Sequence, residues 1–165
     1  MVSDAERGLK TPSIAVLLSL SEALGISLSQ LLEPEASRGP VLMLKAGDHR
    51  VLVDASGVRR EHLGPPVSGS RLEFVRFVLP RGGNTGRLAA HQDGAMEHAH
   101  VDRGTIDISV GSEKVRAAQG DSVVFPADQV HGYANVGRSE ASVYVVVEPG
   151  HSGAGQASAR RHRKL

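Results

Sequence analysis

Apolar and polar positions follow two different periods along the chain. In residues 11–33 apolar residues recur every three or four positions, which is typical of amphipathic helices. From residue 41 onward apolar and polar residues alternate in short runs, which is typical of half-buried β-strands. The segment EPEASRGP, residues 33–40, lies between the two patterns and has the composition of a linker. The patterns predict a short helical unit followed by a small antiparallel sandwich or barrel.

The helical stretch carries the start and stop signals of two helices joined by a tight turn. Thr11 can cap the first helix, Pro12 suits its first position, and Gly25 supplies the left-handed residue that ends it. Ser27 and Gln30 have the spacing of a capping box that opens a second, shorter helix. The first helix has one apolar face, which consists of Ile14, Leu17, Leu18 and Leu24.

The alternating part of the chain consists of short runs separated by clusters of turn residues such as PRGGNTG and AAQGD. Many short strands at close spacing favour a mainly β fold. The predicted strands are residues 41–45, 50–54, 71–79, 105–110, 121–125 and 142–148.

Composition limits the chemistry and the location that the chain can have. The formal net charge of +1 gives no broad attraction to nucleic acid, so contact with DNA requires a local surface. The absence of cysteine excludes disulfides, thiolate metal sites and cysteine nucleophiles, and it suits a reducing cytoplasm. Arg7 and Lys10 precede an apolar run, but Glu22 interrupts that run, which argues against a signal peptide or a membrane span.

The stretch EHAHVDRGTIDI, residues 97–108, raises the question of a metal site, because His98 and His100 lie close to Glu97. Successive side chains of a strand point to opposite faces. If Glu97 points into the barrel, then His98 and His100 point out of it. We therefore expect these two histidines to be exposed, with a role facing a partner or an accessory metal as the alternative.

A second motif lies in GDSVVFPADQVHGYAN, where Gly120, Pro126, His131 and Asn135 have fixed spacing. This motif resembles the second conserved motif of the cupin family, which usually has a glycine where this chain has Asp128. The resemblance implies a cupin-type double-stranded β-helix, also called a jelly-roll barrel.

The first cupin motif pairs a glutamate with a glycine seven positions later, and Glu97 and Gly104 match it. The family's His-x-His pair precedes the glutamate, so His91 matches the first histidine and Asp93 replaces the second. The resemblance implies a pocket formed by His91, Asp93, Glu97 and His131. These ligand types suit Fe(II), Mn(II), Ni(II) or Zn(II). The alternative is that Glu97 and His131 bind each other or a ligand without metal.

The N-terminal part, with Glu6-Arg7-Gly8, Pro12-Ser13 and Ala23-Leu24-Gly25, resembles the end of a lambda-repressor-like (XRE-type) helix-turn-helix domain. In that family most of the recognition helix precedes the Glu-Arg-Gly segment. Two explanations are open: translation starts upstream of Met1, or the protein is a shortened relative that keeps the helix pair for packing or dimerisation. The resemblance implies DNA contacts by the polar residues near the start, namely Ser3, Asp4, Arg7, Lys10 and Thr11.

The predicted organisation is a helix-turn-helix remnant in residues 1–35, a linker in 36–40, a cupin domain in 41–149 and a disordered basic tail in 150–165. The resemblance implies a cytoplasmic homodimer that regulates transcription, with DNA and a small-molecule effector as its partners. The alternatives are a metal-dependent dioxygenase or isomerase that uses His91, Glu97 and His131, and a ligand-binding dimerisation module. The apolar face of the first helix is expected to need a partner chain to cover it.

Overall fold

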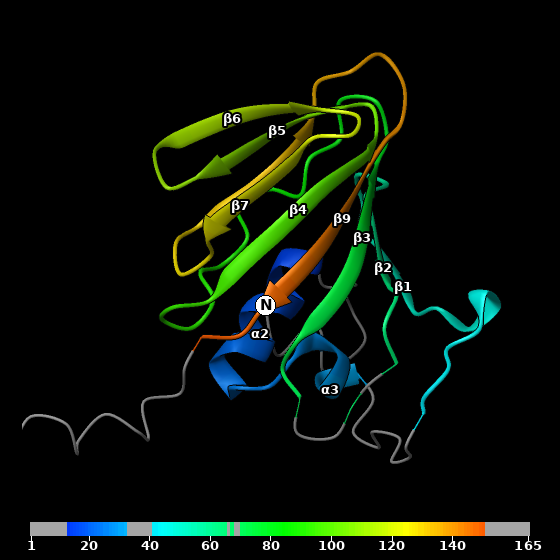
Figure 1. Cartoon of the computed structure of the whole chain (residues 1–165), viewed down its shortest axis with the longest axis vertical. Coiled ribbons are helices and arrows are strands. Elements are labelled where there is room, and N and C mark those ends of the chain that lie inside the picture. Colours follow the sequence, from blue (N-terminus) through cyan, green and yellow to red (C-terminus); the bar gives the residue numbers. More distant parts are fainter. Residues whose placement is uncertain (1–12, 33–40, 66, 68–69, 151–165) are drawn as a thin grey trace, which may run out of the picture.

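Two antiparallel sheets face each other in a barrel, and two helices pack at one end of it (Figure 1). The computed structural model describes residues 13–32, 41–65, 67 and 70–150. The larger sheet has six strands in the order β1-β2-β3-β9-β4-β7, and the smaller has three in the order β6-β5-β8. The helices are α2 (Ile14–Leu24), α3 (Leu28–Leu32) and the short 3-10 helix η1 (Ala46–Asp48). The strands are β1 (Val51–Val53), β2 (Arg59–His62), β3 (Glu73–Leu79), β4 (Met96–Arg103), β5 (Thr105–Val110), β6 (Glu113–Ala118), β7 (Ser122–Pro126), β8 (His131–Asn135) and β9 (Ala141–Glu148).

The mainly β prediction is confirmed, and five of the six predicted strands overlap observed ones: β1, β3, β5, β7 and β9. The prediction of a strand in residues 41–45 is wrong, because those residues form no strand and lead into η1. Their apolar side chains Val41 and Met43 are exposed, so they have no sheet surface to pack on.

Helix α2 begins and ends on identifiable backbone caps. The N-cap is Ser13 rather than the predicted Thr11, since the Ser13 hydroxyl accepts a hydrogen bond from the Val16 N–H at 3.3 Å. Gly25 ends the helix as predicted, with a φ of 67°. Helix α3 follows after Ser27, and its first amide, Leu28 N–H, donates to the Glu73 carboxylate of β3 at 2.8 Å. No helix among the described residues is long and apolar enough to cross a membrane.

The apolar face of α2 is covered by the barrel itself. Ile14, Leu18 and Leu28 are buried in the same hydrophobic cluster as the inward-facing residues of the sheets. The expectation that this face needs a partner chain is therefore wrong for the described structure. Leu24, predicted to share that face, is 62% exposed.

The chain also packs tightly just after β9. Gly150, which was predicted to begin a disordered tail, is buried, and its carbonyl accepts a hydrogen bond from Arg71 at 3.2 Å. A Cβ at this position would lie 2.0 Å from the carbonyl oxygen of Asp93, so only glycine fits here without a shift of the backbone. Residues 151–165 and the linker 36–40 lie outside the described residues.

The glycine of the first motif has a structural role at the turn between β4 and β5. Gly104 has a φ of +84°, a left-handed conformation that a side chain disfavours. A Cβ there would also lie 2.7 Å from the Cβ of Ala141 on β9. The motif therefore requires glycine because the backbone turns sharply against a neighbouring strand.

Candidate functional site

Three of the residues predicted from the motifs meet inside the barrel. Glu97 projects inward from β4, His131 from β8, and His91 from the segment before β4. Glu97 Oε1 lies 3.0 Å from His91 Nε2 and 3.1 Å from His131 Nε2. The potential ligand atoms of this group all lie within 4.8 Å of one another, and no other such group occurs in the described part of the chain. We call these three residues the triad.

The ring of His131 is oriented by its second nitrogen. Its Nδ1 lies 2.8 Å from the carbonyl oxygen of Gln129, which can only accept, so Nδ1 carries the hydrogen. Its Nε2 is buried and close to Glu97, yet it is not aligned for a hydrogen bond and has no such partner among the described residues. A buried nitrogen with this orientation, fixed by a bond at the other nitrogen, is typical of a metal ligand.

His91 lies between two carboxylates. Its Nδ1 is 2.5 Å from Oε1 of Glu22 on α2, and its Nε2 faces Glu97. Both carboxylates accept, so in the metal-free protein both ring nitrogens donate and the ring is an imidazolium. Burial lowers the pKa of His91, but the bonds to Glu22 and Glu97 outweigh burial and raise the pKa to about 9.

Tyr133 on β8 completes the surroundings of Glu97. Its hydroxyl donates to Glu97 Oε2, and its ring packs on Phe77 with centroids 5.5 Å apart. Burial, reinforced by the charge of Glu97, holds the pKa of Tyr133 well above its ordinary value, so it stays a donor and not a base. Burial also raises the pKa of Glu97, but the imidazoles of His131 and His91 outweigh it and hold that pKa far below its usual range.

The stability of the metal-free protein is expected to fall as the pH rises through the alkaline range. The folded-state pKa of His91 is raised from 6.5 to about 9, so its stabilising contribution is complete below pH 6.5 and is lost as the pH approaches 9. Urea unfolding in a chelator between pH 6 and pH 9.5 measures this. The variant His91→Gln lacks the group and should lose this decline; a decline of equal size in the variant would contradict the assignment.

The triad fits a divalent metal ion. Two imidazole nitrogens and one carboxylate oxygen converge on one point, and the His131 nitrogen lacks a hydrogen-bond partner. Such a set suits Zn(II), Fe(II), Mn(II) or Ni(II) and leaves coordination positions for a ligand. A bound ion would supply a Lewis acid at the Glu97 end of the cavity.

The structure does not bring Asp93, the fourth residue of the predicted pocket, to the triad. Asp93 is exposed, because residues 92–95 form a tight turn in which Ala95 N–H donates to the Gln92 carbonyl at 3.0 Å. Asp128, where cupins usually have glycine, accepts a hydrogen bond from Gly94 N–H at 3.3 Å. This carboxylate therefore helps to hold the turn that keeps Asp93 outside.

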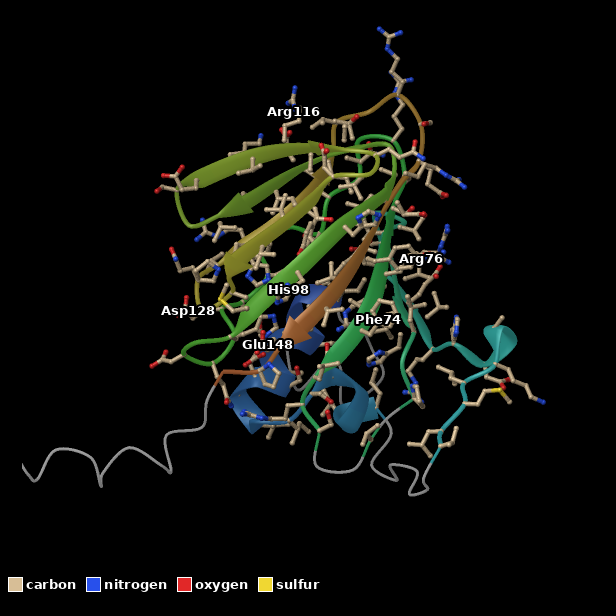
Figure 2. All side chains as sticks on the ribbon, viewed as in Figure 1. Phe74, Arg76, His98, Arg116, Asp128 and Glu148 are labelled. Carbon is tan, nitrogen blue, oxygen red and sulfur yellow. The ribbon has the colours of Figure 1, made fainter. Side chains whose placement is uncertain are left out.

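The outer face of the larger sheet carries the two histidines that follow Glu97 on β4. His98 is exposed beside Glu148, at 3.4 Å, as predicted (Figure 2). His100 is also exposed, as predicted, beside Ser122. Arg76 lies on this outer face and pairs with Glu61 at 2.8 Å, so it does not line the barrel cavity.

A different arginine, Arg60 on β2, occupies the barrel interior. It is 3% exposed, lies 5.9 Å above the Phe77 ring, and pairs with Glu73. Its Nε has no hydrogen-bond partner among the described residues. Arg60 lines a cavity that also contains His91 and Glu97 of the triad. Sequence reasoning missed Arg60, because RREH contains no apolar residue and was not recognised as a strand.

The helical unit contributes to the same cavity. Leu18 of α2 is one of the lining residues, together with Val145 and Val147 of β9. A second hollow, between the helices and the barrel, is lined by Glu22, His91 and Arg71 among others. The end of the barrel that gives access to the triad is thus covered by α2. The described residues do not include those predicted to contact DNA, which are Ser3, Asp4, Arg7, Lys10 and Thr11.

Comparison with known families identifies the β-part of the chain. A family model described as a cupin domain matches residues 75–147, which include the whole triad. The barrel has the cupin fold. The jelly-roll prediction is confirmed, and the matched segment contains Glu97, Gly104 and His131.

Solved structures extend the similarity to the helices. An HTH_3 family transcriptional regulator from Vibrio cholerae is 25% identical, with a TM-score of 0.69 over 92% of this chain and 80% of that chain. The cupin domain of an XRE family transcriptional regulator from Enterobacter cloacae is 18% identical, with a TM-score of 0.51 over 56% of this chain and 96% of that one.

A predicted oxalate decarboxylase from Thermotoga maritima shares the fold, with 18% identity and a TM-score of 0.50 over 64% of this chain and 97% of that one. No curated protein sequence matches the chain. The resemblance to XRE-type regulators with a cupin domain, stated from the motifs, is confirmed by the regulator structures.

Proposed function

We propose that this chain is the sensor part of a DNA-binding transcriptional regulator of the XRE type, in which a small molecule in the cupin cavity changes the position of the helical unit. The observation that carries the proposal is that Leu18 of α2 lines the same cavity as His91 and Glu97. The cavity is small, so a larger molecule would need a lining residue to move, and Leu18 is the lining residue that belongs to the helical unit. Ligand binding and helix docking are therefore linked, as a sensor requires.

The cavity favours a small anion as the effector. Arg60 presents a buried guanidinium with an unpartnered Nε, and a metal on the triad would add a second positive group. The walls between them are apolar, formed by Val75, Phe77 and Val145. A short carboxylate with an apolar body matches this lining.

The proposal includes a homodimer, because two helix-turn-helix units related by a two-fold axis match the two halves of an operator. The proposed DNA contacts, which position the protein on phosphate, are Ser3, Asp4, Arg7, Lys10 and Thr11. The proposed sensor site consists of His91, Glu97 and His131. The similarity to the Vibrio cholerae regulator, which covers helices and barrel together, supports this arrangement.

DNA binding by the protein purified from its own cells tests the proposal, since that protein contains whatever residues precede Met1 there. Fluorescence anisotropy with the DNA upstream of its own gene is expected to show binding that weakens or strengthens when small carboxylates are added. A variant Arg60→Gln is expected to bind the DNA but to lose the response. Absence of DNA binding, or binding that no small molecule changes, would overturn the proposal.

A metal-dependent cupin enzyme, such as a dioxygenase or isomerase, is the second candidate. The triad itself favours it, because it offers metal ligands with open coordination positions. Against it, α2 covers the access to the triad, and Tyr133 is held as a hydrogen-bond donor. This alternative predicts metal-dependent turnover of a small molecule without DNA, which product analysis after incubation with Fe(II) or Mn(II) would detect.

A further inference from the structure

One contact crosses from the helical unit directly to a residue of the triad. Glu22 of α2 and His91 are separated by 69 positions in the chain, yet Glu22 Oε1 lies 2.5 Å from His91 Nδ1. Both side chains are largely buried, with exposed fractions of 24% and 12%. The opposite ring nitrogen, Nε2, is the one that faces Glu97 and the interior.

The two histidines of the triad are held in the same way by different parts of the molecule. His131 Nδ1–H donates to the backbone carbonyl of Gln129, which belongs to the barrel. His91 Nδ1–H donates to Glu22, which belongs to α2. A histidine that ligates a metal through one nitrogen is ordinarily oriented by such an acceptor at the other nitrogen, and a carboxylate acceptor makes it a stronger ligand.

We propose that Glu22 is the positioning residue for His91 as a metal ligand, so that a divalent ion on the triad holds α2 against the barrel. The proposal rests on the proposed sensor function and names the contact through which the site and the helices communicate. A bound ion would replace only the proton on Nε2, so the Nδ1–H bond to Glu22 would be kept. The coupling is reciprocal: docking of α2 tightens metal binding, and metal tightens docking.

The position of Glu22 on α2 adds to the coupling. Leu18 lies one helical turn earlier, on the same face as Glu22. Leu18 enters the barrel cavity while Glu22 reaches the rim at His91. Helix α2 therefore contacts both the cavity, through Leu18, and the triad, through Glu22.

The test is a titration of the full chain with Zn(II) alone, measured by calorimetry in competition with a chelator. Glu22→Gln keeps the shape and an accepting oxygen but removes the charge, and it is expected to weaken Zn(II) binding about 10- to 100-fold. Glu148→Gln is the matched control, because Glu148 also faces a histidine, His98, but at the exposed outer surface. It should leave the affinity unchanged. Cooperative urea unfolding without metal confirms that both variants are folded.

Hydrogen exchange of α2 and α3 provides the second measurement, which an effect on folding alone would not reproduce. Zn(II) is expected to slow exchange of the α2 amides in the parent chain and much less in Glu22→Gln. Equal Zn(II) affinity in parent and Glu22→Gln, no Zn(II) binding by the parent, or exchange that Zn(II) does not change would overturn the proposal. If the coupling is found but DNA binding responds to no ligand, the sensor function fails while the role of Glu22 stands.

Discussion

Replacing Glu97 with alanine is expected to abolish metal binding and to lower the free energy of unfolding by about 3–5 kcal/mol. Glu97 is the common partner of His91, His131 and Tyr133, and it is 3% exposed. Its removal leaves the His91 imidazolium with only Glu22, and it leaves the Tyr133 hydroxyl buried without its acceptor. Urea unfolding measures the loss of stability, and Zn(II) calorimetry measures the loss of binding.

Two further variants separate the roles of Glu97. Glu97→Gln keeps the volume and an accepting oxygen, so it should fold better than the alanine variant while still losing most of the affinity for Zn(II). Glu148→Ala, at an exposed ion pair with His98, should change stability by less than about 1 kcal/mol. Zn(II) binding to Glu97→Ala with the parent affinity would show that the metal lies elsewhere.

Replacing Asn135 with alanine is expected to destabilise the fold by about 3 kcal/mol without a direct effect on the triad. The Asn135 amide is 4% exposed and donates to the carbonyls of Leu79, Pro80 and Ser139 at 2.8 to 3.0 Å. Its oxygen accepts from Gly137 N–H at 2.9 Å. The substitution leaves these groups without partners at the end of the barrel where β3 and β8 meet.

Asn84→Ala is the matched control, because Asn84 is exposed and its side chain makes one local bond, to Gly86 N–H at 3.0 Å. It should cost less than about 1 kcal/mol. In the folded fraction of Asn135→Ala, Zn(II) affinity should equal that of the parent. A large loss of affinity with unchanged stability would assign the motif asparagine to the site instead of the scaffold.

The strands that alternate apolar and polar residues could be predicted from the sequence, and those stabilised by other interactions could not. Strand β2 has the sequence RREH, in which the buried Arg60 and Glu61 form ion pairs with Glu73 and Arg76 of β3. Such pairs join residues distant in sequence, so no local pattern indicates them. Strand β6, EKVRAA, lies at a sheet edge and buries only Ala117, which leaves too little apolar periodicity to recognise.

The triad could be predicted because the cupin motifs fix the relative positions of Glu97, His91 and His131. The same motifs placed Asp93 with them, and no local signal indicated the tight turn that directs this residue outward. Glu22 was noticed only as an interruption of an apolar run. Its partner is 69 positions away, so its role could be found only when α2 and the barrel were seen together. A charged residue within an otherwise apolar helix face was the available signal.

Leu18 in the barrel cavity makes the helix a tethered competitor of any effector. A free molecule has to displace a side chain that is always present at the same effective concentration, since both belong to one chain. If the docked form outnumbers the undocked form by about a hundred to one, the effector binds about 100-fold more weakly than the open cavity allows. Sequence changes that weaken the docking of α2 would then raise the apparent affinity for the effector without altering any residue that contacts it. In the proposed sensor, the effector concentration that produces a response would in this way be set by the helix.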